Sequence, residues 1–234
     1  MNTINIGKKS NLVKKIAQQF KDQIQQKEDS TLCLPTGSSP IEIYKKLIKF
    51  YKRGELSFKE IETYNLDEYL GIDPFKNPLS FRKFMDNYLF DHLDIKKSNT
   101  HFPKTARSYN DALDDVEQFD LTMLGVGVNG HIAFNEPGSE FGRTQEIELT
   151  ESTIKVNFID QGIDDGYPTK AITMGLFDIY EKSNKIILIA WGESKRAVLI
   201  KFKEAKASGE KDPSWPITYF IDHPNFQIYT DLKI

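Results

Sequence analysis

Residues 121–138 read LTMLGVGVNGHIAFNEPG, and the rest of the chain is best understood outward from this stretch. Its apolar start predicts a buried strand of a parallel sheet. Three glycines follow, beginning with Gly125 and Gly127, and glycine lets the backbone approach a ligand closely. An imidazole, His131, and a carboxylate, Glu136, then come just past the end of the strand, where open α/β sheets hold their ligands. This combination favours an active-site loop over a plain turn with a core histidine.

The composition is typical of a soluble globular protein, with 39% hydrophobic and 28% charged residues among 234. The net charge is −3 and no basic face stands out, which argues against a nucleic-acid partner. The longest apolar runs, such as 186–191, are too short to cross a membrane. The polar start, residues 1–9, lacks a signal-peptide core, so we expect a cytoplasmic protein. Cys33 is the single cysteine, which excludes an internal disulfide and a cysteine-based zinc site, and its leucine neighbours predict a buried thiol.

Apolar strands alternate with amphipathic helices along the chain. The patterns predict strands at 31–34, 61–66, 121–126, 186–190, 217–221 and 226–229. They predict a helix after residue 195 and others at 9–26, 41–48, 108–118, 169–180 and, with Tyr88 facing inward, 79–93. Such alternation is typical of a three-layer α/β fold with a mostly parallel sheet. No linker or repeat divides the chain, so we expect residues 1–234 to form a single domain.

Two of the predicted strands end in turns that open a helix. The first turn, residues 35–40 (PTGSSP), has Ser39 as a candidate N-cap and Pro40 in the first helical turn. The second turn follows Ala190 and reads WGESK, ending on Lys195. A helix N-terminus offers free N–H groups and the positive end of the helix dipole, which favour an anion. An ordinary capped turn explains the first sequence equally well.

Four loops follow the predicted strands at residues 34, 66, 124 and 190. The carboxyl ends of parallel strands meet at one edge of a sheet, so we expect these loops to line one pocket. Two of them form the anion-binding turns, to which Lys195 adds a cation. The other two carry an acid/base set: Asp67, Glu68, His131 and Glu136. An anion clamp beside an acid/base set indicates chemistry on a phosphorylated metabolite.

Four segments, in chain order LPTGSSPIEIYKKL, NLDEYLGI, LGVGVNGHIAFNEPG and GESK, resemble the glucosamine-6-phosphate deaminase (isomerase) family. The resemblance runs through almost the whole chain, and NGHIAFNEPG is highly specific. It implies a modified doubly wound, Rossmann-like α/β fold. It also implies conversion of an amino-hexose 6-phosphate to fructose 6-phosphate and ammonia, with a sugar phosphate as the partner and with neither a cofactor nor a metal.

By this resemblance Asp67 is the base that takes the C2 proton of the sugar and returns it at C1. His131 helps to open the sugar ring, since imidazole moves protons near neutral pH. Glu136 orients and tunes His131, and Asn129 stands where some members have an aspartate that helps to orient the histidine. One carboxylate above two neighbouring carbons can carry the proton between them when burial raises its basicity.

The resemblance also implies which residues bind the sugar phosphate. The loop after the first predicted strand and the lysine of the GESK segment hold the phosphate, while further substrate contacts come from the acidic pair and the glycine loop. The expected binding residues are Thr36, Gly37, Ser38, Ser39, Glu68, Gly125, Gly127 and Lys195. Each has a plain alternative, such as a solvated surface charge for Glu68 or Lys195.

The chain departs from the family pattern in the polar segment 139–168, whose glycines predict a mobile lid or a connection. Ile154 and Ile159 stand where the family usually has arginines, one of them a phosphate ligand. Either the phosphate is held less tightly here, or another cation replaces the arginine. The candidates for that replacement are Lys155, Lys170 and Arg143.

Basic residues that form an allosteric phosphate site in some members are also missing, with Gln145 and Ile147 roughly in their places. We therefore expect no activation by N-acetylglucosamine 6-phosphate. The altered lid, together with the segments GLFDIY and PITYFIDHPNF, looks more like the galactosamine-6-phosphate branch of the family. Both amino sugars are open as substrates.

Two other functions compete with this interpretation. The 6-phosphogluconolactonases are similar in the glycine loop, but they lack the run 135–138 and tend to have an arginine where this chain has Tyr69. A non-catalytic sugar-phosphate sensor would need a DNA-binding module, and only one helix is predicted before residue 31. The remaining histidines, His92, His101 and His223, lack a comparable setting and are expected to be structural. The sequence leaves both a monomer and a homo-oligomer open.

Overall fold

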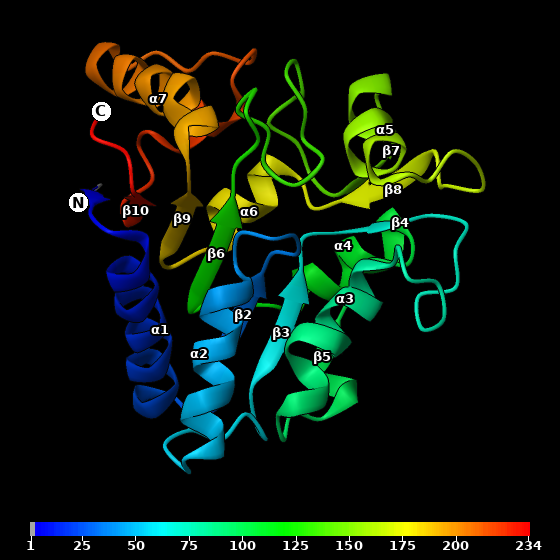
Figure 1. The fold of residues 1–234 in the computed structure, drawn as a ribbon, viewed down its shortest axis with the longest axis vertical. Helices are drawn as coiled ribbons and strands as arrows, with labels where there is room; N and C mark the ends of the chain where they lie inside the picture. The colour runs from blue at the N-terminus through cyan, green and yellow to red at the C-terminus, as the bar shows by residue number, and fades with distance from the viewer. Residues whose placement is uncertain (1–2) are drawn as a thin grey trace.

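The computed structural model describes residues 3–234, so Met1 and Asn2 of the polar start lie outside the described residues. Its centre is a seven-stranded sheet in the order β1-β10-β9-β6-β2-β3-β5, in which all neighbours are parallel. The strands are β1 (Thr3–Ile6), β2 (Thr31–Leu34), β3 (Glu62–Asn65), β5 (Thr100–His101), β6 (Leu121–Gly125), β9 (Ile186–Ala190) and β10 (Phe226–Thr230). The first and last strands pair, so the two ends of the chain lie close together (Figure 1).

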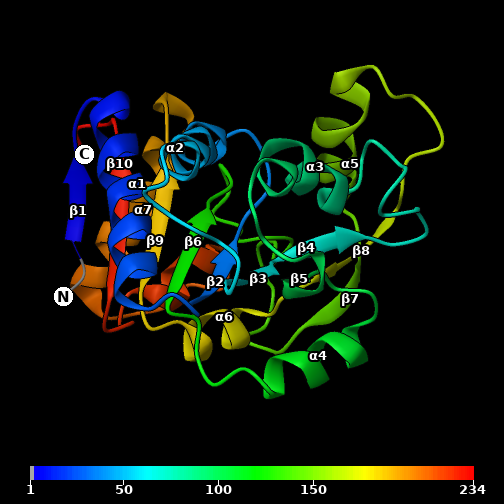
Figure 2. The ribbon, with the colours of Figure 1, turned by 90° about the horizontal axis from the view of Figure 1, so that it is seen from below.

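Helices cover both faces of this sheet (Figure 2). One face carries α1 (Lys9–Gln26), α2 (Ile41–Lys52) and α3 (Phe81–Tyr88), and the other carries α4 (Ala106–Asp114), α6 (Leu176–Lys182) and α7 (Arg196–Ser208). Ile187 and Ile189 of β9 share a core with α1 and α2, whereas Ile186 and Leu188 share one with α6 and α7. Alternate strand residues point to opposite faces, so a strand that is apolar throughout needs helices on both sides. The predicted three-layer, doubly wound α/β fold is confirmed.

A small second sheet, which the periodicity does not predict, lies beside the first. It is antiparallel, in the order β4 (Asp67–Tyr69), β8 (Lys170–Thr173) and β7 (Gln145–Glu148), with α5 (Glu151–Asn157) close by (Figure 1). The predicted helix over 169–180 is wrong at its start, because β8 pairs on both sides before α6 begins. The sheet and α5 share a separate small core formed by Tyr69, Phe134, Leu149, Phe158 and Ala171.

The predicted strand over 217–221 is also wrong. These residues mostly belong to the 3-10 helix Pro216–Phe220, whose first residue has no N–H to offer a sheet. Other short 3-10 turns are Phe90–His92, Lys97–Asn99, Ile159–Gln161 and Glu193–Lys195.

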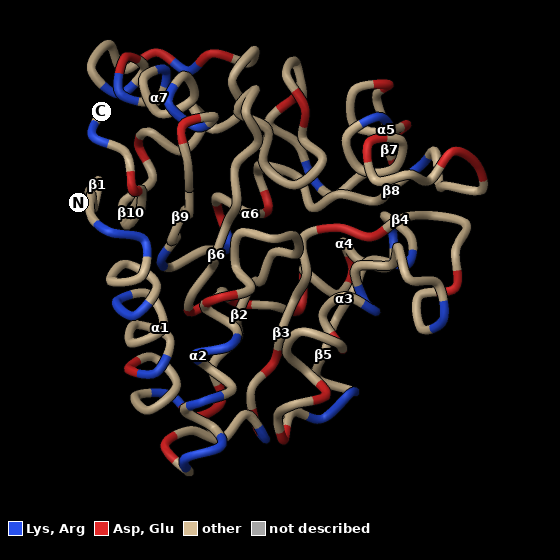
Figure 3. Tube along the Cα trace, in the orientation of Figure 1, with Lys and Arg blue, Asp and Glu red and all other residues tan. Residues whose placement is uncertain are grey.

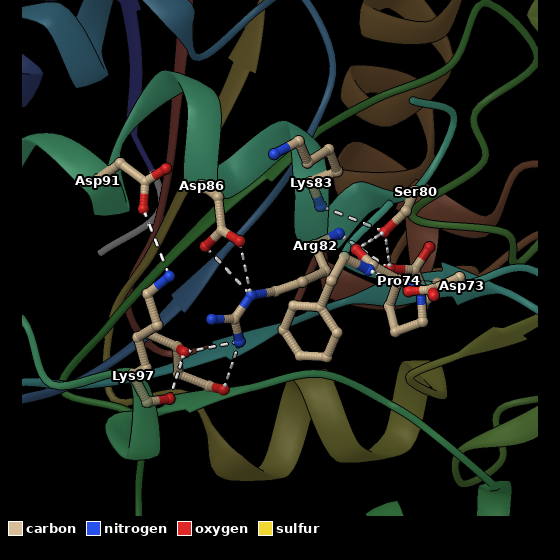
Figure 4. A network of polar contacts seen from close by, with 11 residues as sticks. Asp73, Pro74, Ser80, Arg82, Lys83, Asp86, Asp91 and Lys97 are labelled. Atoms are coloured by element: carbon tan, nitrogen blue, oxygen red, sulfur yellow. Dashed lines mark hydrogen bonds and ion pairs between the residues drawn. The ribbon is translucent and has the colours of Figure 1, made fainter. Parts of the chain in front are cut away.

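Helix α3 buries charged side chains that an apolar pattern cannot reveal. Tyr88, predicted to face inward, is 42% exposed, while Arg82 and Asp86 are buried. Arg82 Nε lies 3.1 Å from Asp86 Oδ1 (Figure 4), and its Nη1 donates a hydrogen bond of 2.8 Å to Thr100 Oγ1. The ion pair holds the guanidinium within α3, and the hydrogen bond from Arg82 to Thr100 ties the helix to β5 at the edge of the central sheet.

The remaining charges are spread over the molecule. Lysine and arginine are interspersed with aspartate and glutamate along the trace (Figure 3). Within residues 3–234, no helix has both the length and the apolar character that crossing a bilayer requires.

Candidate active site

The candidate site lies at the carboxyl edge of the central sheet. Strands β9, β6, β2 and β3 are consecutive and parallel, so the loops that follow them emerge at the same edge. Side chains tie neighbouring loops together. Trp191 Nε1 donates a hydrogen bond to the carbonyl of Ser39 (3.3 Å), and Asn65 Nδ2 donates one to the carbonyl of Leu34 (2.9 Å).

The glycines after β6 allow the loop to fold tightly around the imidazole. The N–H of Gly127 donates to the carbonyl of His131 at 2.9 Å. A Cβ on Gly127 would lie only 2.3 Å from the His131 ring, so the ring packs directly against this backbone. Gly130 has φ +85° and packs against Trp215, which holds the far side of the loop. Gly125, by contrast, has no heavy atom near its Cβ position and ends β6.

Glu136 is the centre of a polar cluster beside His131. Its Oε2 accepts a hydrogen bond from Asn129 Nδ2 (2.8 Å) and lies 3.5 Å from His131 Nδ1. Its Oε1 accepts a hydrogen bond from Thr153 Oγ1 of α5 (2.8 Å). Burial opposes ionisation of Glu136, but His131, Thr153 and Asn129 outweigh burial and lower the pKa of Glu136 to about 2. Thr153 is 17 residues away in the chain, and no local pattern indicates its part in this cluster.

Asp67 begins β4 and is almost completely buried, with 7% of its surface exposed. Burial, reinforced by the charge of Glu68, raises the pKa of Asp67 to about 8. Its cross-strand neighbour is Thr173 of β8, whose Oγ1 accepts a hydrogen bond of 3.1 Å from the N–H of Phe134. The strand that carries Asp67 and the loop that carries His131 therefore meet at the same residue.

Glu68 directs both carboxylate oxygens into the protein. Oε1 accepts hydrogen bonds from the N–H groups of Tyr69 (2.9 Å) and Phe81 (3.0 Å). Oε2 accepts them from Ser80 Oγ (2.8 Å) and the N–H of Arg82 (2.9 Å). Three of these donors form the N-terminus of α3, which Ser80 caps (Figure 4). Those three come from 12 to 14 residues away, so the sequence around Glu68 alone does not reveal this arrangement.

The loop after β2 has several main-chain N–H groups without an acceptor among the described residues. Within the described residues, the N–H groups of Gly37, Ser38 and Ser39 donate no hydrogen bond. The sequence predicted Ser39 as the N-cap of α2, and this prediction is wrong. Pro40 occupies the N-cap position, without a hydrogen bond from a side chain. Thr36 is partly buried beside them. The loop is anchored from below by the Tyr44 hydroxyl, which donates to the carbonyl of Pro35 (2.5 Å).

Lys195 ends the turn after β9, where Gly192 takes a positive φ of +82°. The ammonium is half-buried and has no ion-pair partner in the part of the chain that the structure describes. Burial lowers the pKa of Lys195, because an uncompensated charge is poorly solvated there. An anion at this position would supply the missing countercharge.

The three cations expected to replace the missing arginine differ in whether they already have an ion-pair partner. Arg143 is already paired with Asp114 (2.8 Å) and Asp178 (3.0 Å), and Lys170 with Glu148 (2.7 Å). Lys155 is exposed on α5 and has no partner among residues 3–234.

The two isoleucines that the resemblance aligns with family arginines have different surroundings. Ile154 packs against the small core under α5, while Ile159 is 45% exposed. Gln145 and Ile147, which the resemblance aligns with basic residues of some family members, both lie in β7.

The other titratable side chains singled out in the sequence have structural contacts. Cys33 is fully buried. His101 stacks on Tyr64 with ring centroids 4.3 Å apart, and His223 Nε2 lies 2.9 Å from the carbonyl of Ser183. His92 Nε2 lies 3.0 Å from the carbonyl of Asn87.

Comparisons with known proteins bear on the whole chain. A profile of the family of glucosamine-6-phosphate isomerases and 6-phosphogluconolactonases matches residues 9–228. The glucosamine-6-phosphate deaminase of Malacoplasma penetrans is 39% identical, over 98% of this chain and 97% of that protein. The glucosamine-6-phosphate deaminase of Lysinibacillus sphaericus is 41% identical, over 89% of this chain and 90% of that protein.

Solved structures give the same picture. A monomeric glucosamine-6-phosphate deaminase is 32% identical, with a TM-score of 0.90 over 98% of this chain and 97% of that chain. The 6-phosphogluconolactonase of Thermotoga maritima is 18% identical, with a TM-score of 0.72 over 98% of this chain and 99% of that chain. The second similarity is one of fold alone.

Proposed function

Since this chain belongs to the family of glucosamine-6-phosphate isomerases and 6-phosphogluconolactonases, we propose that it converts glucosamine 6-phosphate and water to fructose 6-phosphate and ammonia. The relatives with about 40% identity over most of the chain carry the name of this deaminase. The observation that carries the proposal is Asp67, a buried carboxyl with a pKa raised to about 8, on a strand that meets the His131 loop at Thr173.

The first chemical step we propose is opening of the sugar ring. It requires transfer of a proton from the C1 hydroxyl to the ring oxygen, and His131 is the group suited to carry it near neutral pH. Glu136 stays ionised beside the imidazole, because its pKa is lowered to about 2. Asn129 holds the Glu136 carboxylate by a hydrogen bond of 2.8 Å, so the carboxylate stays beside the imidazole ring of His131.

The second step moves the C2 proton to C1. Asp67 accepts the proton from C2, while the aldehyde oxygen at C1 gains a proton that the ammonium group of the substrate gives up. The product is an enolamine with a hydroxyl at C1, and the same carboxyl then returns its proton to C1. The C2 imine that results adds water and expels ammonia, which leaves the ketone of fructose 6-phosphate. A buried carboxylate is a stronger base than an exposed one, which supports Asp67 in this role.

We propose that the phosphate binds between the loop after β2 and the turn after β9. The free N–H groups of Gly37, Ser38 and Ser39, the hydroxyl of Thr36 and the unpaired Lys195 are complementary to a dianion. Gly125 and Gly127 leave room for the sugar near His131. Lys155 is the free cation that can contribute from α5.

In this proposal Glu68 stabilises the structure around the site and does not contact the substrate. Its four accepted hydrogen bonds leave its oxygens no capacity for a sugar hydroxyl. These hydrogen bonds hold β4 against α3. The buried negative charge of Glu68 also raises the pKa of its neighbour Asp67.

Galactosamine 6-phosphate is the second candidate substrate, and the apolar residues Ile154 and Ile159 at the arginine positions favour it. The same proposal treats residues 1–234 as one domain, since β1 and β10, from distant parts of the chain, pair in one sheet. It also places the enzyme in the cytoplasm. It also expects no activation by N-acetylglucosamine 6-phosphate, because Gln145 and Ile147 carry no positive charge.

The test is ammonia release from glucosamine 6-phosphate and galactosamine 6-phosphate, side by side, with and without N-acetylglucosamine 6-phosphate. We expect a higher kcat/KM with the glucosamine compound and no effect of the acetylated sugar. A preference for the galactosamine compound would reassign the substrate. Absence of ammonia from both, with hydrolysis of 6-phosphogluconolactone, would refute the proposed reaction.

A further inference from the structure

Helix α5 is joined to the rest of the protein by two side-chain hydrogen bonds. Thr153 Oγ1 donates to Glu136 Oε1 (2.8 Å), and Asn157 Nδ2 donates to the hydroxyl of Tyr69 (3.0 Å). Residues four apart lie on the same side of an α-helix, one turn from each other. Both bonds therefore leave the same side of α5.

The two partners belong to different halves of the candidate site. Glu136 lies in the loop after β6, with its Oε2 3.5 Å from His131 Nδ1. Tyr69 ends β4, two residues after Asp67, and therefore on the same side of that strand. The Tyr69 ring packs against Phe134 of the histidine loop, with centroids 5.5 Å apart. Helix α5 thus bridges the loop of the imidazole and the strand of the buried carboxyl.

The helix depends on these contacts for its position. It has seven residues, which is too short to be stable by itself in water. Phe158 and Ile154 reach the small core, but Lys155 and Val156 on the outer side are exposed. Apolar contacts resist separation without fixing orientation, whereas the two directional hydrogen bonds, from Thr153 and from Asn157 one turn later, define the orientation of the helix.

We propose that Thr153 and Asn157 are positioning residues: they fasten α5 across both halves of the active site, and Thr153 fixes the Glu136 carboxylate beside His131. This role rests on the proposed function. Asn129 holds one oxygen of Glu136 and Thr153 holds the other. Without the Thr153 hydroxyl, Oε1 has no donor within the described residues, and Asn129 alone restrains the carboxylate beside the imidazole.

Three variants separate this role from simple packing. Thr153→Val keeps the shape of the side chain and removes the hydroxyl, while Thr153→Ser keeps the hydroxyl. Val156→Thr is the matched control, because it makes the reverse exchange of the same two side chains on the same helix, at a position that is 60% exposed. A fourth variant, Tyr69→Phe, removes the second bond from its other partner.

Two measurements are needed on each variant. Hydrogen exchange of residues 154–158 without substrate reports the attachment of α5 and does not depend on any activity. Steady-state kinetics with glucosamine 6-phosphate report the effect on the reaction. For Thr153→Val we expect faster exchange and a fall in kcat of about tenfold with little change in KM, since a displaced catalytic group slows the reaction more than it weakens phosphate binding. Thr153→Ser recovers most of kcat, and Val156→Thr matches the wild type in both measurements.

Two results would overturn the proposal. One is faster exchange in Thr153→Val with unchanged kcat, which would make the hydroxyl merely structural. The other is an equal loss in Thr153→Ser and Thr153→Val, which would show that packing and not the hydroxyl matters. A wild-type protein that releases no ammonia would refute the proposed function, and the positioning role with it, while hydrogen exchange would still show whether Thr153 and Asn157 hold α5.

Discussion

Replacing Asp67 by asparagine should make the stability of the protein less dependent on pH. The side chain is 7% exposed, and burial, with the charge of Glu68, raises the pKa of Asp67 from 3.8 to about 8. Below pH 3.8 the carboxyl is protonated in both the folded and the unfolded chain, so it does not affect the balance between them. Above that pH the unfolded chain ionises freely while the folded protein retains the proton. Stability is therefore lost as pH rises toward about 8.

The size of this effect follows from the shift. Each pH unit in this window costs about 1.4 kcal/mol of unfolding free energy, which gives about 3 kcal/mol between pH 5 and pH 7. Over the whole window the cost is on the order of 5 kcal/mol, which is a large part of the stability of a typical domain. The asparagine side chain of the variant cannot ionise, so the variant escapes this loss. The unfolding free energy of the variant, relative to that of the wild type, should therefore rise by about 3 kcal/mol between pH 5 and pH 7.

The assay is urea unfolding of the wild type and of Asp67→Asn at pH 5, 6, 7 and 8, followed by tryptophan fluorescence. Any constant effect of the amide on packing cancels in the difference between pH values. Asp111→Asn is the control, since Asp111 is exposed on α4 and its loss should leave the pH dependence of the wild type unchanged. Parallel stability curves for the wild type and Asp67→Asn would refute the reasoning, because they would show that the folded protein does not hold the proton of Asp67.

Three further predictions concern two of the loops at the sheet edge and the start of α6. Gly127→Ala should lower kcat by about 100-fold with the fold retained by circular dichroism, since its Cβ would lie 2.3 Å from the His131 ring and must displace it; normal kcat would mean that the ring position is not critical. Lys195→Met should raise KM for the sugar phosphate by about 10- to 100-fold, the loss of one charge-assisted contact, and an unchanged KM would remove Lys195 from the phosphate site. Gly175→Ala should lower the unfolding free energy by about 3 kcal/mol in urea, because its Cβ would meet the Gly142 carbonyl at 2.0 Å and overpack the start of α6; wild-type stability would show that this contact relaxes without cost.

The edge of the central sheet could be predicted from the sequence because its strands are locally distinct. The run 186–190 is apolar at every position, and 121–125 is nearly so, which is the pattern of strands covered on both faces. Once those strands are parallel, their loops share one edge, and Asp67 and His131 fall there with no further information. The family resemblance then supplied chemical roles for the same residues.

The second sheet could not be predicted in this way. β8 is four residues long and is a strand because β4 and β7 pair with it from distant parts of the chain. Local propensity does not contain these pairings, so the sequence reads as the start of a helix. The short 3-10 helix Pro216–Phe220 is the opposite case, an apolar run that is buried without being a strand.

The directions in which side chains point could not be predicted from the sequence either. Asp67 and Glu68 are adjacent, and only strand geometry separates them: alternate residues point to opposite sides, so Glu68 reaches α3 and Asp67 faces the other way. In the same way, the hydrogen bond from Thr153 to Glu136 joins residues 17 apart through the fold.

The most direct test of the proposed chemistry is the fate of the C2 hydrogen. Glucosamine 6-phosphate with deuterium at C2 would be converted under single-turnover conditions, and the fructose 6-phosphate formed would be analysed by mass spectrometry and NMR. If Asp67 carries the proton between the two carbons, ammonia is released, part of the deuterium appears at C1, and both are lost in Asp67→Asn. Release of ammonia with no deuterium at C1, or with full activity in Asp67→Asn, would contradict transfer by this carboxyl.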